Sequence, residues 1–164
     1  DLASRQGVGY LRLDKSKINN VAVVRENYKI GLGNILRDGT DYTIIVCGGI
    51  AEVAIIAAND LQDKGISCKV ISMHTIKPID SLLIGKCVKE TKGIITIEEG
   101  NTTGGLGSAV LEACAEMDVF PKKMRILGIR DEYISVVGSQ DYLRDYVGLS
   151  KKSLVNSIVE LDSL

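Results

Sequence analysis

The sequence predicts an α/β domain of three layers, in which helices cover both faces of a mainly parallel, mixed sheet of about five strands. Two observations predict this class. Short apolar runs rich in β-branched residues, each typical of a buried strand, alternate along the chain with stretches of helical periodicity. Because each strand is followed by a helix, consecutive strands are expected to be joined by right-handed crossovers and to lie parallel.

The first strand and helix are predicted between residues 43 and 65. Residues 43–47 are a nearly continuous apolar run that ends in Gly48-Gly49. Beyond this pair, apolar residues recur at the spacing of one helix face, and Gly65 stands where a C-terminal cap is expected. This face consists of Ile50, Val53, Ala54, Ala57, Ala58 and Leu61.

The second unit covers residues 68–97. Residues 68–73 form the next predicted strand, and 75–79 an extended connection, because Pro78 cannot lie inside a helix. Asp80 is expected to cap the following helix, which ends before a third buried strand at 94–97. The inward face of that helix consists of Leu83, Ile84, Cys87 and Val88.

The last part of the chain repeats the pattern. A glycine-rich loop at 100–107 leads into a helix that stops before Pro121, and a fourth strand is predicted at 125–129. Ser139 and Ser150 are suited to the N-caps of two further helices. The final helix has an apolar face of Leu154, Val155, Ile158 and Leu161.

Residues 1–27 stand outside this alternation. A strand is conceivable at 10–13, but the following residues are mostly polar and pass into a charged stretch, as a linker does. We therefore expect 1–27 to be a tail plus a linker, and 28–164 to be the α/β domain. The first residue is Asp1 rather than Met, which suggests a piece of a longer protein.

Composition limits the classes of function. The 20 Lys and Arg against 21 Asp and Glu leave a net charge of −1, which argues against a generally basic nucleic-acid binder. The uncharged apolar runs are far shorter than the roughly 18 residues of a membrane span, and no export leader is recognisable. The cysteines are scattered, and with the single histidine, His74, they form no zinc-binding spacing, so we expect core thiols in a cytoplasmic setting. They are Cys47, Cys68, Cys87 and Cys114.

The glycine-rich loop is the first candidate for chemistry. Its context, after a strand and before a helix, suits a phosphate, but Val110 replaces the third glycine of a dinucleotide fingerprint and no phosphate-loop lysine follows. Close packing at a turn is the favoured interpretation. Glu98 and Glu99 precede the loop, and adjacent residues of a strand point to opposite faces. They are therefore not expected to form an acid–base pair; capping of the loop or an interface contact is expected for at least one of them.

Two other polar groups follow predicted strands. His74 ends one strand without an Asp, Ser or Cys at a catalytic spacing, which favours a hydrogen-bonded structural role. Asp131 follows the fourth strand, and a magnesium site of Glu98, Glu99 and Asp131 is conceivable. No motif fixes such a site, and solvated loop acids are the commoner case.

Several stretches together resemble one family. They are 36–45, Gly48-Gly49, 74–80 (His-Thr-Ile-Lys-Pro-Ile-Asp), 97–101 and 104–109, with weaker echoes at 138–140 and 146–149. The set is similar to the C-terminal portion of transketolase-type thiamine-diphosphate enzymes, and most similar to the C-terminal section of the short, split transketolases. One departure is Gly100, where that family commonly has a histidine.

The resemblance implies roles for the first residues. It suggests that 1–27 are the tail of a preceding pyrimidine-binding domain plus the linker, with 7–13 as the last strand of that domain, although Val8 replaces the usual proline. Lys15 then stands where the family commonly has an arginine that contacts the sugar phosphate; a lysine supplies charge but not the bidentate fork. No catalytic, cofactor or metal residue is implied within the chain. Thiamine diphosphate and magnesium belong to the complete enzyme.

The resemblance also implies a function. The chain would be the C-terminal domain of a transketolase, inactive alone, supporting dimer assembly of an enzyme that transfers two-carbon ketol units between sugar phosphates. Its expected partners are a second copy and the missing thiamine-binding domains or subunit, with neither nucleic acid nor membrane. The expected interface loop consists of Glu98, Glu99, Asn101, Gly104, Gly105 and Gly107. The alternatives are the same domain of deoxyxylulose-phosphate synthase or of a 2-oxo acid dehydrogenase β subunit, and a free-standing module whose 100–107 loop binds a small anion.

Overall fold

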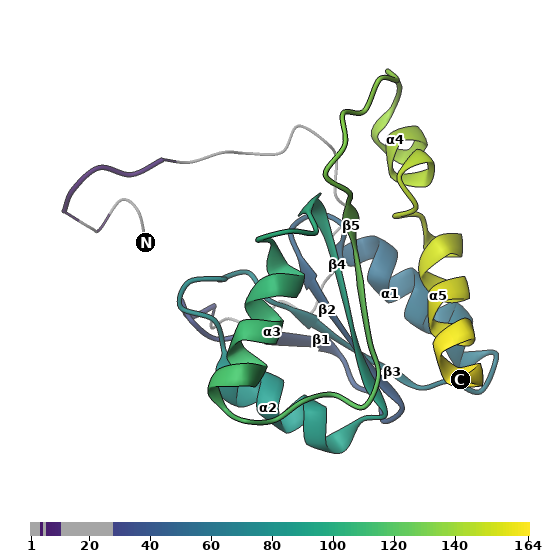
Figure 1. Cartoon of the computed structure of the whole chain (residues 1–164), viewed down its shortest axis with the longest axis horizontal. Helices are drawn as coiled ribbons and strands as arrows, with labels where there is room; N and C mark the ends of the chain where they lie inside the picture. The colour runs from purple at the N-terminus through teal and green to yellow at the C-terminus, as the bar shows by residue number, and fades with distance from the viewer. Residues whose placement is uncertain (1–3, 5, 11–27) are drawn as a thin grey trace.

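The computed structural model describes residues 4, 6–10 and 28–164, and these contain one five-stranded sheet in the order β1-β3-β2-β4-β5 (Figure 1). The strands are β1 (Asn34–Arg37), β2 (Tyr42–Cys47), β3 (Cys68–Ser72), β4 (Gly93–Asn101) and β5 (Met124–Ile129). The helices are α1 (Ala51–Gln62), α2 (Ser81–Glu90), α3 (Leu106–Glu116), α4 (Gln140–Tyr146) and α5 (Lys151–Ser163). The predicted three-layer α/β class with a mainly parallel, mixed sheet is confirmed.

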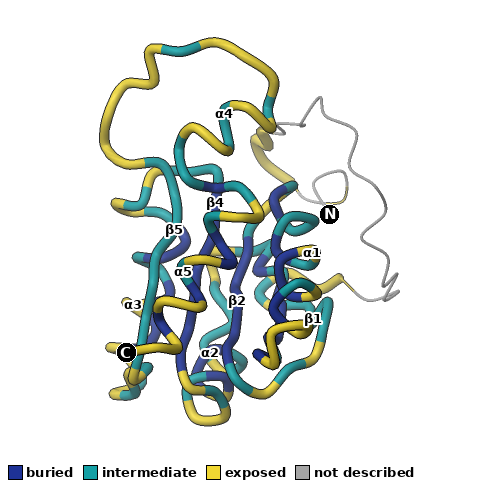
Figure 2. The backbone as a smooth tube through the Cα atoms, turned by 90° about the vertical axis from the view of Figure 1, so that its right-hand side faces the viewer, coloured by how far each residue is buried: buried dark blue, intermediate teal, exposed yellow. Residues whose placement is uncertain are grey.

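The two faces of the sheet carry separate hydrophobic cores. Because side chains alternate along a strand, Ile44 and Val46 of β2 pack with α1 and α5, whereas Ile45 packs with α2 and α3. Figure 1 shows these two helix pairs on opposite sides of the sheet, and Figure 2 shows the central strands buried between them. Burial on both faces is why β2 reads as an unbroken apolar run rather than an alternating one.

Local capping signals act as predicted. The Asp80 carboxylate accepts a hydrogen bond from Leu83 N at 3.0 Å, at the start of α2. Ser139 and Ser150 accept from the third residue beyond them and cap α4 and α5. Three of the four cysteines are buried and all four are free thiols.

Strand β1 was not identified from its own sequence. Its four residues are too few to show a clear alternation of apolar and polar side chains. They become a strand by pairing antiparallel with β3, with Asn34 opposite Ser72 and Ile35 opposite Ile71. The other neighbouring strands pair in parallel. This edge strand makes the sheet mixed.

The order of the strands creates a change of direction between β2 and β4. From β2 the chain crosses through α1 to β3 on one side, and then through α2 to β4 on the other side. The adjacent strands β2 and β4 therefore lead into α1 and α3, which lie on opposite faces (Figure 1). In open α/β sheets the diverging loops at such a point form a crevice outside the carboxyl ends of the strands.

The segment after β5 projects beyond this edge. Residues 130–139 contain neither helix nor strand and lead into α4, and Figure 1 shows both standing above the sheet. Figure 2 shows most of this segment exposed, and Tyr133 and Val137 are almost completely exposed. No helix among the described residues combines the length and apolarity needed to cross a membrane.

Residues 11–27 lie outside the described residues, and they include Lys15. Of the predicted strand at 7–13, residues 11–13 also lie outside the described residues, whereas 7–10 are described and contain no strand. Two assignments therefore stay predictions: that of 1–27 to a preceding domain and linker, and that of Lys15 to a phosphate contact.

Candidate functional site

A cavity of about 780 Å³ opens at the carboxyl ends of β2 and β4. The backbone of Gly48, Gly49 and Gly100 and the side chains of Glu98 and Glu99 border it on the sheet side. The facing wall comes from the segment after β5, which contributes apolar side chains together with Gln140 and Arg144. The cavity thus lies where the loop from β2 to α1 and the loop from β4 to α3 diverge to opposite faces of the sheet.

Glu98 fixes the glycine-rich loop from within. Its side chain is buried, and Oε1 accepts a hydrogen bond from the backbone amide of Gly107 at 3.2 Å, in the first turn of α3. The N-cap residue of α3 is Gly105, which has no side chain to offer, so Glu98 supplies the acceptor instead. A carboxylate at a helix N-terminus is also stabilised by the helix dipole. The prediction that one of the paired glutamates caps the loop is confirmed.

The glycines of the loop are shaped by this contact. A Cβ atom at Gly105 would overlap the Glu98 carboxylate and the Asn101 carbonyl, although the backbone angles of Gly105 are ordinary. Gly104, in contrast, has a φ of +75° and open space around it. The remaining polar groups satisfy one another: Asn101 Oδ1 accepts from the Thr103 amide, and Ser108 Oγ accepts from the Gly104 amide.

These contacts bear on the small-anion alternative. An anion at the 100–107 loop would need the amides at the start of α3, and the Glu98 carboxylate already occupies that position. A second negative charge there would meet a like charge at close range. The geometry therefore argues against an anion site in this loop and supports the internal turn.

Glu99 points the other way, as expected for the next residue of a strand. Its Oε1 accepts hydrogen bonds from Arg144 Nε at 2.9 Å and from Gln140 Nε2 at 3.0 Å. These contacts tie the first and second turns of α4 to the end of β4 across more than forty residues of sequence. Glu98 and Glu99 thus serve different elements and do not form an acid–base pair. Arg144 and Gln140 were not identified from the sequence, since no local pattern indicates which carboxylate a helix residue will reach.

The other predicted polar groups do not join the site. His74 Nδ1 lies 3.0 Å from Thr75 Oγ1, and its ring contacts Tyr28, away from the cavity. Asp131 is exposed beyond β5. Within 4, 6–10 and 28–164, no three His, Cys, Asp or Glu residues gather closely enough to hold a metal ion.

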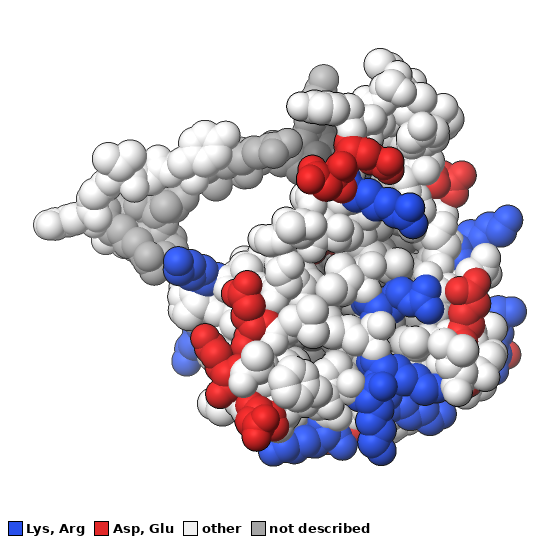
Figure 3. All heavy atoms as spheres, viewed as in Figure 1, with Lys and Arg blue, Asp and Glu red and all other residues white. Residues whose placement is uncertain are grey.

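Cys47 borders the cavity and pairs in register with Glu98. Burial, and the Glu98 carboxylate to a smaller extent, raise the pKa of its thiol, which disfavours the nucleophilic thiolate. On the face of the molecule seen in Figure 3, basic side chains gather towards the lower end, whereas the upper end, around α4, carries both acidic and basic side chains. The cavity lining itself combines the carboxylates of Glu98 and Glu99 with the Arg144 guanidinium and apolar side chains, so the site is of mixed polarity.

The fold and the site define a three-layer α/β domain whose carboxyl-edge carboxylates are engaged in internal contacts. Residues 31–154 match the family described as "Transketolase, C-terminal domain". The chain belongs to this family, which confirms the resemblance seen in the motifs.

Two relatives and one solved structure give the scale of the similarity. The 6-deoxy-6-sulfo-D-fructose transketolase subunit SqwH of Clostridium sp. (strain MSTE9) is 31% identical over 98% of this chain and 49% of its own length. The 1-deoxy-D-xylulose-5-phosphate synthase of Heliobacterium modesticaldum is 39% identical over 80% of this chain and 20% of its own. A structure described as "Split gene transketolase, inactive beta4 tetramer" superposes with a TM-score of 0.79 at 30% identity, covering 91% of this chain and 47% of that one. The chain thus spans about half the length, or less, of these proteins.

Proposed function

We propose that the chain is the C-terminal part of a transketolase, which transfers two-carbon ketol units between sugar phosphates only when joined to a thiamine-binding part. The observation that carries this proposal is the match of nearly the whole chain to about half of a transketolase subunit. The internal use of Glu98 and Glu99 supports a structural role, because neither is left as a general acid or base. Thiamine diphosphate and magnesium would be bound by the other part.

A deoxyxylulose-phosphate synthase is the second candidate, and the identity with the Heliobacterium protein favours it. Since both enzymes contain this domain, the product separates them. The purified chain should be combined with its thiamine-binding part, thiamine diphosphate and magnesium, and assayed both for ketol transfer between sugar phosphates and for formation of 1-deoxyxylulose 5-phosphate. We expect ketol transfer by the combination and none by the chain alone. Activity of the isolated chain, or synthase product only, would contradict the proposal.

The proposed phosphate contact of Lys15 can be tested in the combined enzyme. If it contacts the substrate phosphate, Lys15→Ala removes a charge-assisted hydrogen bond of about 1.5 to 3 kcal/mol. The Michaelis constant for phosphorylated sugars should then rise roughly tenfold to a hundredfold. An unchanged constant would remove Lys15 from the substrate site.

The proposed assembly is a two-fold dimer that uses the carboxyl edge of the sheet. Exposed aromatic side chains of the projecting segment support an interface there, since Tyr133, Tyr142 and Tyr146 are each more than half exposed. Sedimentation of the chain over a range of concentrations should show reversible association. A monomer at every practical concentration would contradict self-association.

A further inference from the structure

We infer that the cavity between β2, β4 and α4 is a binding site for a small organic anion, a phosphate or carboxylate compound with an apolar body, held by Arg144. Gly100 borders this site, but the site does not use the helix N-terminus at the end of the 100–107 loop, which is taken by Glu98. It is also independent of the proposed ketol transfer, because it requires no residue of the thiamine-binding part.

The first support is the number of hydrogen-bond donors of Arg144 that are not used within the described residues. Its side chain is only 13% exposed, yet only Nε donates a hydrogen bond, to Glu99. Nη1 lies 3.9 Å from the fully solvated carboxylate of Asp141, which is too long for a hydrogen bond. Among the described residues, the two Nη groups therefore have no hydrogen-bond acceptor. A guanidinium carries five N–H donors in a rigid fork. Neither Nη atom is among the buried polar atoms that lack a partner, so both reach solvent and can donate to a ligand in the cavity.

The second support is the anchoring of this group. The hydrogen bond from Nε to Glu99 holds the guanidinium beside the cavity, which Arg144 lines. Gln140 bonds the same Glu99 oxygen and holds the carboxylate in place. The edge that remains, Nη1 and Nη2, matches the paired oxygens of a phosphate or carboxylate.

The third support is the size and nature of the remaining wall. The volume of about 780 Å³ lies in the range of small-molecule sites. Leu143, Val147 and Leu149 line the side next to Arg144, so the ligand needs an apolar or planar body as well as its charge. The crevice lies at the carboxyl ends of adjacent parallel strands with diverging connections, where α/β sheets bind ligands.

Binding is tested with three probes on the purified chain: inorganic phosphate, AMP and 3-phenylpropionate. AMP, phenylpropionate or both should bind saturably and more tightly than inorganic phosphate, because only they contact the apolar wall. In a nitrogen–proton correlation spectrum, the amide signals of Gly48, Gly49 and Gly100 should move, whereas that of Gly104 should stay. No saturable binding of any probe up to about 10 mM, or movement confined to other amides, would overturn the inference.

Two variants connect binding to Arg144. Arg144→Gln should weaken binding at least about tenfold, as expected for loss of a charge-assisted contact. Glu99→Gln keeps the acceptor for Nε but removes a competing negative charge, so it should strengthen anion binding several-fold. A merely structural ion pair would not produce opposite effects in the two variants. The inference would be contradicted if Arg144→Gln bound the probes as tightly as the unmodified chain does, or if Glu99→Gln bound them more weakly.

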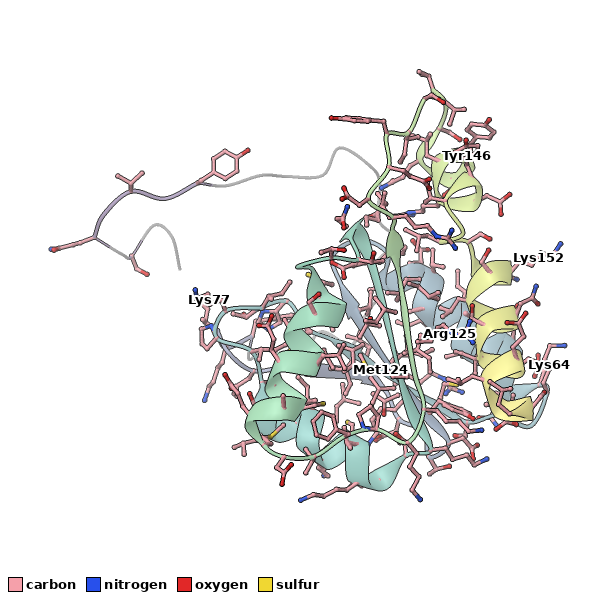
Figure 4. The ribbon with its side chains drawn as sticks, in the orientation of Figure 1. Lys64, Lys77, Met124, Arg125, Tyr146 and Lys152 are labelled. Atoms are coloured by element: carbon pink, nitrogen blue, oxygen red, sulfur yellow. The ribbon has the colours of Figure 1, made fainter. Side chains whose placement is uncertain are left out.

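The matched control is Arg125→Gln. Arg125 also belongs to an ion pair, with Glu160 at 4.0 Å, and Figure 4 places it between β5 and α5, below α4. This variant should bind the probes as the unmodified chain does. If Arg144→Gln fails to fold, Arg144→Lys replaces it: lysine keeps the charge without the fork, and we expect weakened but measurable binding.

Discussion

The Glu98 carboxylate and the Gly107 amide lie nine residues apart in the chain and 3.2 Å apart in space. The hydrogen bond closes the glycine-rich loop over the end of β4 and supplies the cap that Gly105 lacks. An acidic residue at the carboxyl edge of an α/β sheet, next to a glycine-rich loop, would ordinarily attract a catalytic interpretation. Here the carboxylate belongs to the architecture of the loop.

Replacing Glu98 by Ala should lower the free energy of unfolding by about 1 to 2 kcal/mol, the usual loss for a helix cap. Glu98→Gln keeps an acceptor oxygen and loses only the charge, so its effect should be smaller. Urea denaturation measures both, with Glu112→Ala on the exposed side of α3 as control. An effect of Glu98→Ala no larger than that of Glu112→Ala would show that the hydrogen bond contributes nothing.

The two neighbouring glycines should respond differently to alanine. Gly104→Ala places a methyl group in open space but at a φ of +75°, which costs about 1 to 2 kcal/mol. Gly105→Ala has no such backbone strain, but its methyl group overlaps Glu98 and Asn101 and must displace them. We expect the larger loss of stability in Gly105→Ala, measured by thermal unfolding. A bulky residue at Gly105 therefore disturbs the loop itself and is unsuitable as a test of the interface.

The ion pair of Glu99 and Arg144 should be worth more than a surface pair, because the two side chains are only 31% and 13% exposed. In a double-mutant cycle with alanine, we expect a coupling energy of about 1 to 2 kcal/mol. The control is Lys151 with Asp60, a 2.8 Å pair whose side chains are 49% and 40% exposed, with an expected coupling of about 0.2 to 1 kcal/mol. Equal couplings would mean that α4 is not held to β4 by this contact.

Asp41 should contribute stability that depends on pH. The Ser67 amide donates to its carboxylate at 2.7 Å and Lys92 lies 3.0 Å away, and together they hold the pKa of Asp41 below its usual 3.8. Because the folded pKa is lowered, the stabilisation is present above 3.8 and is lost as the pH falls through the folded value.

Asp41→Asn should therefore be less stable than the unmodified chain near neutral pH, with the difference shrinking as the pH is lowered through and below 3.8. Urea denaturation across this range measures the difference. Asp63→Asn is the control, since the Asp63 side chain is exposed and makes no hydrogen bond to a described residue. A constant difference at all pH values would contradict the assigned linkage.

The sequence identified many residues of the candidate site but did not predict which of them contact one another. Glu98 and the glycines that follow it stand out because a strand and a turn are local patterns, and the opposite directions of Glu98 and Glu99 follow from the period of a strand. Arg144 gave no such signal. Its partner lies 45 residues earlier in the chain, and nothing within α4 distinguishes a helix residue that reaches the sheet from one that faces water.

The sequence by itself determined the α/β class, the positions of β2, β3 and β5, the start of β4, the caps at Asp80, Ser139 and Ser150, and the family motifs. These depend on hydrophobic period and on hydrogen bonds between residues close in the chain, so short stretches carry them. The predicted end of β4 at residue 97 was wrong: the strand continues to Asn101, which pairs with Ile129 of β5. Only the tertiary structure decided the antiparallel strand β1, the strand order, the cavity between β2 and β4, and the contact of Glu99 with Arg144. Each requires segments distant in sequence to meet, and their meeting is decided by how the two helical layers bury both faces of one sheet.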